Sequence, residues 1–108
     1  MIGYIMVGTR NLDKALAFYS PLFAAMGWKV YWKGDSHCSF GEAKDPNAPH
    51  FIVGYPFDGK PASMGNGTMT AFRFDDTEMV DRLYEMALEL GGSSEGKPGY
   101  RPQYGEGF

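Results

Sequence analysis

The first residues of the chain follow a two-residue repeat. Over residues 2–8 the side chains alternate in the manner of a β-strand, which places Ile5 and Val7 on one face. Tyr4 and Met6 then point to the opposite face. The pattern predicts a strand that packs under a helix through Ile5 and Val7 and leaves Tyr4 and Met6 for a different environment.

From Leu12 to Met26 the apolar residues recur every three or four positions, which is typical of an amphipathic helix. Asn11 is suited to cap the N-terminus of this helix, and Gly27 is suited to end it. Pro21 lies inside the pattern, so we expect it to kink the helix or to remove one backbone hydrogen bond.

Further strands and a second helix are predicted after this point. Residues 28–33, 37–42 and 50–55 form three short strands, because turn-forming residues separate them. Residues 57–67 are rich in Gly, Pro and Ser and are interpreted as a linker, and residues 68–74 are predicted to form another strand.

The second helix is expected to begin near Asp76, either with this residue as its cap or with Asp75 and Glu78 forming a capping box. Gly91 and Gly92 are expected to end it. The apolar face of this helix comprises Val80, Leu83, Ala87 and Leu90.

The two strand–helix units are related by a constant offset of 65 residues. The offset takes Tyr4 to Met69, Val7 to Phe72, Asn11 to Asp76, Tyr19 to Tyr84 and Gly27 to Gly92. A full set of such matches favours an internal repeat, and therefore two copies of a strand–helix unit with more strands after each. Residues 93–108 leave room for fewer strands than residues 28–55, so we expect an early end to the second copy or a neighbouring chain that completes its sheet.

Composition narrows the class of protein. The 108 residues suffice for one domain, and 44% apolar with 16% aromatic residues allow a packed core. The net charge of -3 with mixed signs argues against a nucleic-acid partner. No apolar run is long enough to cross a bilayer, and the lone Cys38 fits a reducing compartment, so we expect a soluble, cytoplasmic protein without a membrane partner.

Three segments together resemble one known family. They are IGYIMVGTRNLDKALAFYSPLFAAMGW, PFDGKPASMGNGTMTAFRFDDTEMVDRLYEMALELGG and KPGYRPQYGEGF. In their order and spacing they are similar to the glyoxalase/bleomycin-resistance/dioxygenase (vicinal oxygen chelate) superfamily. The resemblance covers nearly the whole chain and is carried by the order of weak motifs, among them the pairs Asn11-Leu12 and Phe18-Tyr19.

The resemblance implies an α+β fold in which paired βαβββ modules form a curved, cup-like mixed sheet with the helices on the outside. On this basis residues 1–108 form one glyoxalase/bleomycin-resistance-like domain, with module one at 1–56, a linker at 57–67 and an incomplete module two at 68–108. The last two strands of the family fold are then missing from this chain. The family also implies a homodimer.

The family holds a divalent metal through His, Gln or Glu side chains from four strands. Carried over to this chain, the first-strand position is Tyr4, the fifth-strand position is Met69, and the fourth-strand position falls near Gly54. A neutral phenol and a thioether are poor ligands for hard cations, and glycine offers none. We therefore expect no metal, no cofactor and no catalytic residue, and we lean against an enzyme.

The cup of the family fold suggests a set of ligand-binding residues. They are Tyr4, Met6, Met69 and Arg73 on the strands, with Arg101 and Tyr104 in the loop that edges the cup. An apolar and aromatic pocket of this kind suits a small planar organic molecule. The alternatives are a cup collapsed into core, and an Arg73 that pairs with an acid such as Glu42 or Glu106 or extends to solvent at the strand end.

The other chemically active side chains give weaker indications. His37 and His50 lie on different predicted strands without the spacing of a shared metal site, and His50 is expected to be exposed at a strand start. Cys38 is expected to be a buried small hydrophobe, because its neighbour His37 points to the opposite face.

Three functions follow as hypotheses. The first is a non-catalytic binder of a small organic molecule in the cup between the modules, without metal. The second is an enzyme of the same superfamily, either a metal-dependent lyase or dioxygenase or a metal-free isomerase. The third is a truncated structural remnant that dimerises without a ligand.

Overall fold

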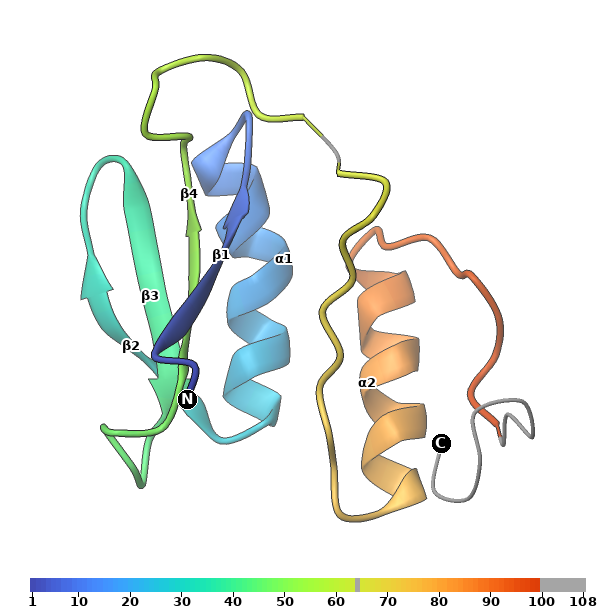
Figure 1. Ribbon diagram of the computed structural model, residues 1–108. Helices are drawn as coiled ribbons and strands as arrows, with labels where there is room; N and C mark the ends of the chain where they lie inside the picture. Colours follow the sequence, from blue (N-terminus) through green and yellow to red (C-terminus); the bar gives the residue numbers. More distant parts are fainter. Residues whose placement is uncertain (64, 100–108) are drawn as a thin grey trace. The chain divides into compact units, whose positions relative to one another are not determined.

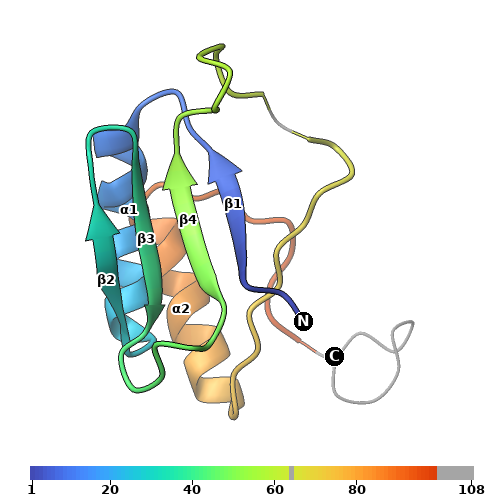
Figure 2. The ribbon, with the colours of Figure 1, turned by 60° about the vertical axis from the view of Figure 1, so that its left-hand side comes forward.

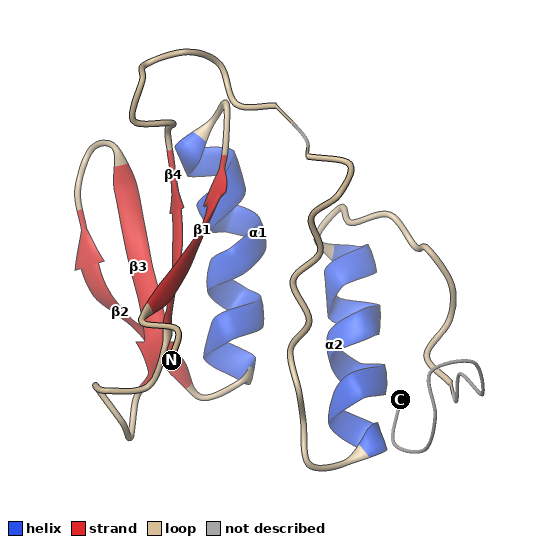
Figure 3. Ribbon diagram, in the orientation of Figure 1, coloured by secondary structure: helices blue, strands red, loops and turns tan. Residues whose placement is uncertain are grey.

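The computed structural model describes residues 1–63 and 65–99 of the chain (Figure 1). The elements are β1 (Tyr4–Gly8), α1 (Leu12–Ala25), β2 (Trp28–Lys33), β3 (His37–Glu42), β4 (His50–Gly54) and α2 (Thr77–Glu89), coloured by type in Figure 3. They belong to two compact units, Met1–Met69 and Thr70–Phe108. No helix within the described ranges is long and apolar enough to cross a membrane.

The first unit is a four-stranded mixed sheet with the strand order β1-β4-β3-β2 (Figure 2). β1 pairs in parallel with β4, so that Tyr4 lies opposite His50 and Gly8 opposite Gly54. The β2–β3 and β3–β4 pairs are antiparallel. This arrangement is a βαβββ module, and it confirms the predicted α+β class and the strands of the first half.

Helix α1 covers one face of this sheet (Figure 2). The buried core comprises Leu12, Phe23, Cys38, Phe40, Phe51 and Val53, and Ile5 and Val7 pack against it. Phe23 lies at the centre, with its ring centroid 4.8 Å from that of Phe40 and 5.1 Å from those of Trp28 and Phe51. Close-packed aromatic rings of this kind contribute area burial and a further edge or stacking energy, so this face of the sheet is the structural face.

The ends of α1 are those that the sequence predicts. The side chain of Asn11 accepts a hydrogen bond from the Lys14 amide at 3.0 Å, which satisfies one of the free amides of the first turn. Gly27 follows the helix with φ +82°, a left-handed conformation that favours glycine. The helix is continuous through Pro21, so the proline does not end it.

The second unit contains α2, which also begins as predicted. Asp76 caps it alone, accepting from the Met79 amide at 2.8 Å, and Gly91 follows its last turn with φ +104°. Leu83 is its buried residue.

The predicted strand at 68–74 is wrong for this structure, since these residues form no strand. An extended segment becomes a strand only when another backbone pairs with its amides and carbonyls. The sequence pattern shows that residues 68–74 can form a strand, but it does not show which strand would pair with them. The sheet described here therefore has four strands and is not strongly curled, whereas a closed cup would need more strands.

Candidate functional site

The face of the sheet opposite α1 is the candidate site. Its β1 residues are Tyr4 and Met6, which are 63% and 46% exposed. Ile5 and Val7 alternate with them and pack on the core, so the predicted orientation of β1 is confirmed. Pairing of Met6 with Ile52 extends the apolar surface across β4. We call this surface, with Tyr4, Met6, Ser39, His50 and Ile52, the open face.

His50 is the polar centre of the open face. Its Nδ1 lies 3.1 Å from the Ser39 hydroxyl, and its Nε2 lies 3.2 Å from the Pro46 carbonyl oxygen. Because a carbonyl only accepts, Nε2 carries the proton in the neutral ring, and Nδ1 accepts from Ser39. Both nitrogens of the neutral ring are therefore engaged inside the protein.

The ring of Tyr31 stacks on His50 with a centroid separation of 4.6 Å, and the Tyr31 hydroxyl donates to the Glu42 carbonyl oxygen. These contacts hold the imidazole in place and partly bury it. The expectation that His50 would be exposed at a strand start is therefore wrong, because partners distant in sequence cover it.

His37 lies at the other end of the open face. It pairs with Gly54 on β4, so it is four strand positions from the level of His50, or roughly 13 Å along the strand. Its ring contacts that of Trp32 at 4.4 Å, and its Nδ1 lies 3.0 Å from the Ser36 hydroxyl. The two histidines therefore do not converge on one ion, as the sequence predicts.

The metal positions implied by the family can be tested against this geometry. A Cβ added at Gly54 would lie 2.4 Å from the His37 Cβ and 2.8 Å from the Ser36 carbonyl oxygen, so there is no room for a side chain there. Tyr4 offers a neutral phenol and Met69, 91% exposed, a soft thioether. Across residues 1–63 and 65–99, no group of three or more His, Cys, Asp and Glu residues is placed to hold an ion. The residues do not fit a hard divalent cation.

The structure describes only some of the other predicted ligand-binding residues. Arg73 is exposed in the irregular segment before α2. Arg101 and Tyr104 lie outside the described residues. The binding roles predicted for these residues and for Met69 stay predictions.

Cys38 is buried in the core under α1, as predicted. Burial raises the pKa of its thiol, and the nearby positive charge of Lys33 opposes this in part. A protonated, enclosed thiol is a poor nucleophile.

Sequence reasoning missed the cluster of Tyr31, Ser39 and His50. Ser39 and His50 meet across the β3–β4 pair, and Tyr31 lies at the β-bulge between Val30 and Trp32 in β2. Strand alternation alone places Ser39 and His50 on the open face, but it does not give the register that brings them together. That alternation was the one available signal.

The comparisons with known proteins agree with this fold. A family model described as the glyoxalase/bleomycin resistance protein/dioxygenase superfamily matches residues 1–105. A glyoxalase/bleomycin resistance protein from Albidiferax ferrireducens T118 superposes with a TM-score of 0.79 at 26% identity, covering 94% of this chain and 82% of that one.

A candidate glyoxalase from Bacillus halodurans superposes with a TM-score of 0.62 at 18% identity, covering 84% of this chain and 69% of that one. At this identity the likeness concerns the fold alone. A search of curated protein sequences gives no match. With a family model that spans nearly all of its length, the chain belongs to the glyoxalase/bleomycin resistance protein/dioxygenase superfamily.

Proposed function

We propose that this protein binds a small organic molecule on the open face of its sheet, without a divalent metal at the position used elsewhere in the superfamily. The observation that carries the proposal is the exposure of Tyr4 and Met6 on a face that no part of α1 covers. Binding of small molecules and dimer formation are typical of the superfamily.

The chemistry of the face indicates how the ligand is recognised. Tyr4, Met6 and Ile52 give an apolar surface with one phenolic hydroxyl. His50 adds little hydrogen-bonding capacity, because Ser39 and Pro46 already engage its neutral ring. Shape and apolar contact therefore dominate, which favours a flat, largely uncharged molecule.

The proposed site is completed by a second β module. The outer edge of β1 is not paired with another strand in the described sheet, and an open edge accepts a further strand. We propose that a second copy of the chain supplies it, forming the curved cup of paired modules in a homodimer. Met69, Arg73, Arg101 and Tyr104 would then line the cup.

Ligand screening with matched variants tests the proposal. A panel of planar aromatic compounds is screened by thermal shift, and each hit is titrated calorimetrically. Covering an aromatic side chain contributes about 1.5–3 kcal/mol, so Tyr4→Ala should weaken binding about tenfold or more.

Met6→Ala and Val30→Ala form a matched pair, because both residues are 46% exposed. Val30 pairs with Phe40 and so lies on the α1 side of the sheet. Only Met6→Ala should weaken binding. Equal effects of the two substitutions, or no ligand in the panel, would contradict the proposal.

Metal analysis separates this function from a metal-dependent lyase or dioxygenase. Binding should be unchanged after treatment with a chelator and after addition of Zn, Ni, Mn or Fe. Stoichiometric metal in the purified protein, with binding that depends on it, would favour the enzyme instead. Sedimentation gives the oligomeric state, and a compact monomer that binds ligand fully would exclude the dimer as part of the site.

A further inference from the structure

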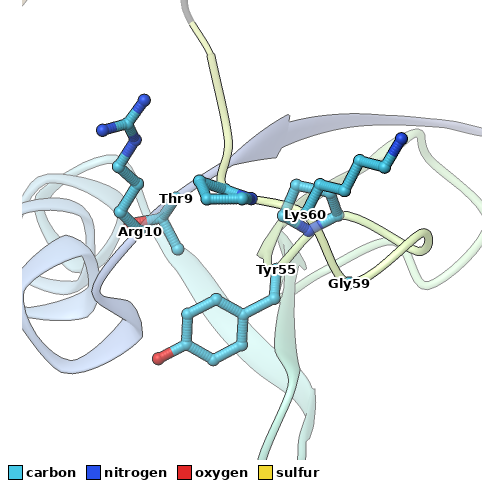
Figure 4. Close-up of a pocket in the computed structure, with 7 residues that line it drawn as sticks. Thr9, Arg10, Tyr55, Gly59 and Lys60 are labelled. Atoms are coloured by element: carbon cyan, nitrogen blue, oxygen red, sulfur yellow. The ribbon is translucent and has the colours of Figure 1, made fainter.

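A hollow of about 370 Å³ lies where β1 and β4 end (Figure 4). It is built from the residues that follow Gly8 and Gly54, outside the open face. Its lining comprises Thr9, Arg10, Tyr55, Pro56, Gly59, Lys60 and Pro61. Parallel pairing of β1 and β4 brings these two loops to the same edge of the sheet.

The loop after β4 is held in shape by local hydrogen bonds. The Gly59 amide donates to the Pro56 carbonyl oxygen at 3.0 Å, and the Lys60 amide donates to the Asp58 carboxylate at 2.9 Å. Gly59 has φ +75°, which favours glycine. The turn fixes the backbone from which the Lys60 side chain extends.

The loop after β1 is hydrogen-bonded to the segment that follows β4. Arg10 Nε donates to the Ala62 carbonyl oxygen at 2.7 Å, and the Tyr55 hydroxyl accepts from the Leu12 amide at 3.1 Å. The Arg10 contact leaves the N–H groups on both terminal nitrogens of its guanidinium free to donate. The Arg10 side chain and the backbone of both loops are therefore positioned before any ligand arrives.

The charged side chains that line the hollow, Arg10 and Lys60, are both positive. No carboxylate of the described ranges forms an ion pair with Arg10 or Lys60. Asp58, the acid of the same loop, caps the turn through the Lys60 amide and does not line the hollow. A guanidinium held in place and a nearby ammonium, neither with an acidic partner, favour an oxyanion, which guanidinium binds through paired hydrogen bonds.

We propose that this hollow binds the oxyanion group of a small organic molecule, with Arg10 and Lys60 contacting the phosphate or carboxylate. The ring of Tyr55 and the two prolines contact the apolar body of the ligand. This site does not depend on the open face, and its ligand is of the opposite kind, charged instead of uncharged.

Titration of the full chain with phenyl phosphate, benzoate and inorganic phosphate, followed by backbone amide chemical shifts, tests the proposal. Saturable binding in the range of about 1 mM or tighter is expected for one of the two aromatic anions, with shifts centred on residues 9–10 and 55–61. The two aromatic anions distinguish a phosphate from a carboxylate preference, and inorganic phosphate shows what the apolar body adds.

Three substitutions each remove one positive charge, two at the hollow and one elsewhere. Arg10→Gln and Lys60→Gln should each weaken binding about tenfold, as loss of one charge-assisted hydrogen bond predicts. Lys44→Gln, at an exposed position in another loop, should leave binding within about twofold, because exposed charges beyond a Debye length are screened. Equal weakening by all three substitutions, or shifts that do not saturate, would overturn the proposal. Tyr4→Ala should not change this binding, so failure here and failure of the open-face site are distinguishable.

Discussion

Gly54 gives the sharpest test of whether β4 has room for a side chain where the family resemblance implies a metal ligand. The substitution Gly54→Ala introduces a Cβ at 2.4 Å from the His37 Cβ and 2.8 Å from the Ser36 carbonyl oxygen. Carbon atoms in contact prefer about 3.5–4.0 Å, so the neighbouring strand must move by about 1 Å. The Tyr55 amide donates to that same Ser36 oxygen at 2.9 Å, which resists the movement.

The expected cost is that of overpacking, about 1–3 kcal/mol. In a domain of this size each kcal/mol lowers Tm by about 4 °C or somewhat more. Thermal unfolding followed by circular dichroism should therefore show Gly54→Ala at least about 4 °C below the parent protein. Gly54 does not have a positive φ, so the change measures crowding and not backbone strain.

Gly3→Ala is the matched control, because an added Cβ at Gly3 meets nothing within 4 Å. It should change the unfolding free energy by less than about 0.5 kcal/mol. If Gly54→Ala is as stable as Gly3→Ala, the position has room for a side chain. The steric argument against a β4 metal ligand then fails.

Two further predictions concern the core. Phe23→Ala should lower the free energy of unfolding, measured by urea denaturation, by about 3–5 kcal/mol, because Phe23 packs against four other rings. A loss under about 1 kcal/mol would mean that the core is not centred on Phe23. Burial raises the pKa of the Cys38 thiol above its ordinary value of 9.0. As the pH rises past 9.0, the thiol therefore loses its proton in the unfolded chain before it does so in the folded protein. The stability that the protonated thiol contributes is full below pH 9.0 and is lost as the pH rises further. Cys38→Ala should therefore reduce the fall in Tm between pH 8 and about pH 10, and an unchanged fall would assign it to other groups, such as Tyr19, whose pKa burial also raises.

The elements of the first unit could be predicted from the sequence because their signals are local. Alternation in residues 2–8 gives β1 and its two faces, and the cap at Asn11 with the stop at Gly27 gives α1. The apolar pattern of the second helix likewise predicted α2, with Asp76 as one of its two candidate caps. Each of these depends on neighbours within a few residues.

Properties that depend on distant partners could not be predicted in this way. The exposure of His50 was misjudged because Ser39 reaches it across the β3–β4 pair and Tyr31 reaches it from the bulge in β2. The strand at 68–74 was predicted from propensity, but pairing needs a second backbone that sequence does not specify. The hollow between Arg10 and Lys60 joins two loops that only the parallel β1–β4 pair brings together.

Sequence and structure together indicate what a hard-cation site on this sheet would require. The sequence has a phenol at Tyr4 and no side chain at Gly54, where the family resemblance implies metal ligands, and one substitution each could change this in principle. The structure adds that His37 and Ser36 fill the space beside Gly54, so an acid introduced there would displace the neighbouring strand. His50, which pairs with Tyr4, is bound to Ser39 and Pro46, and freeing it would leave a buried hydroxyl without its partner. Building a hard-cation site on this sheet would require coordinated changes on β1, β3 and β4, whereas the proposed apolar recognition by Tyr4 and Met6 requires none.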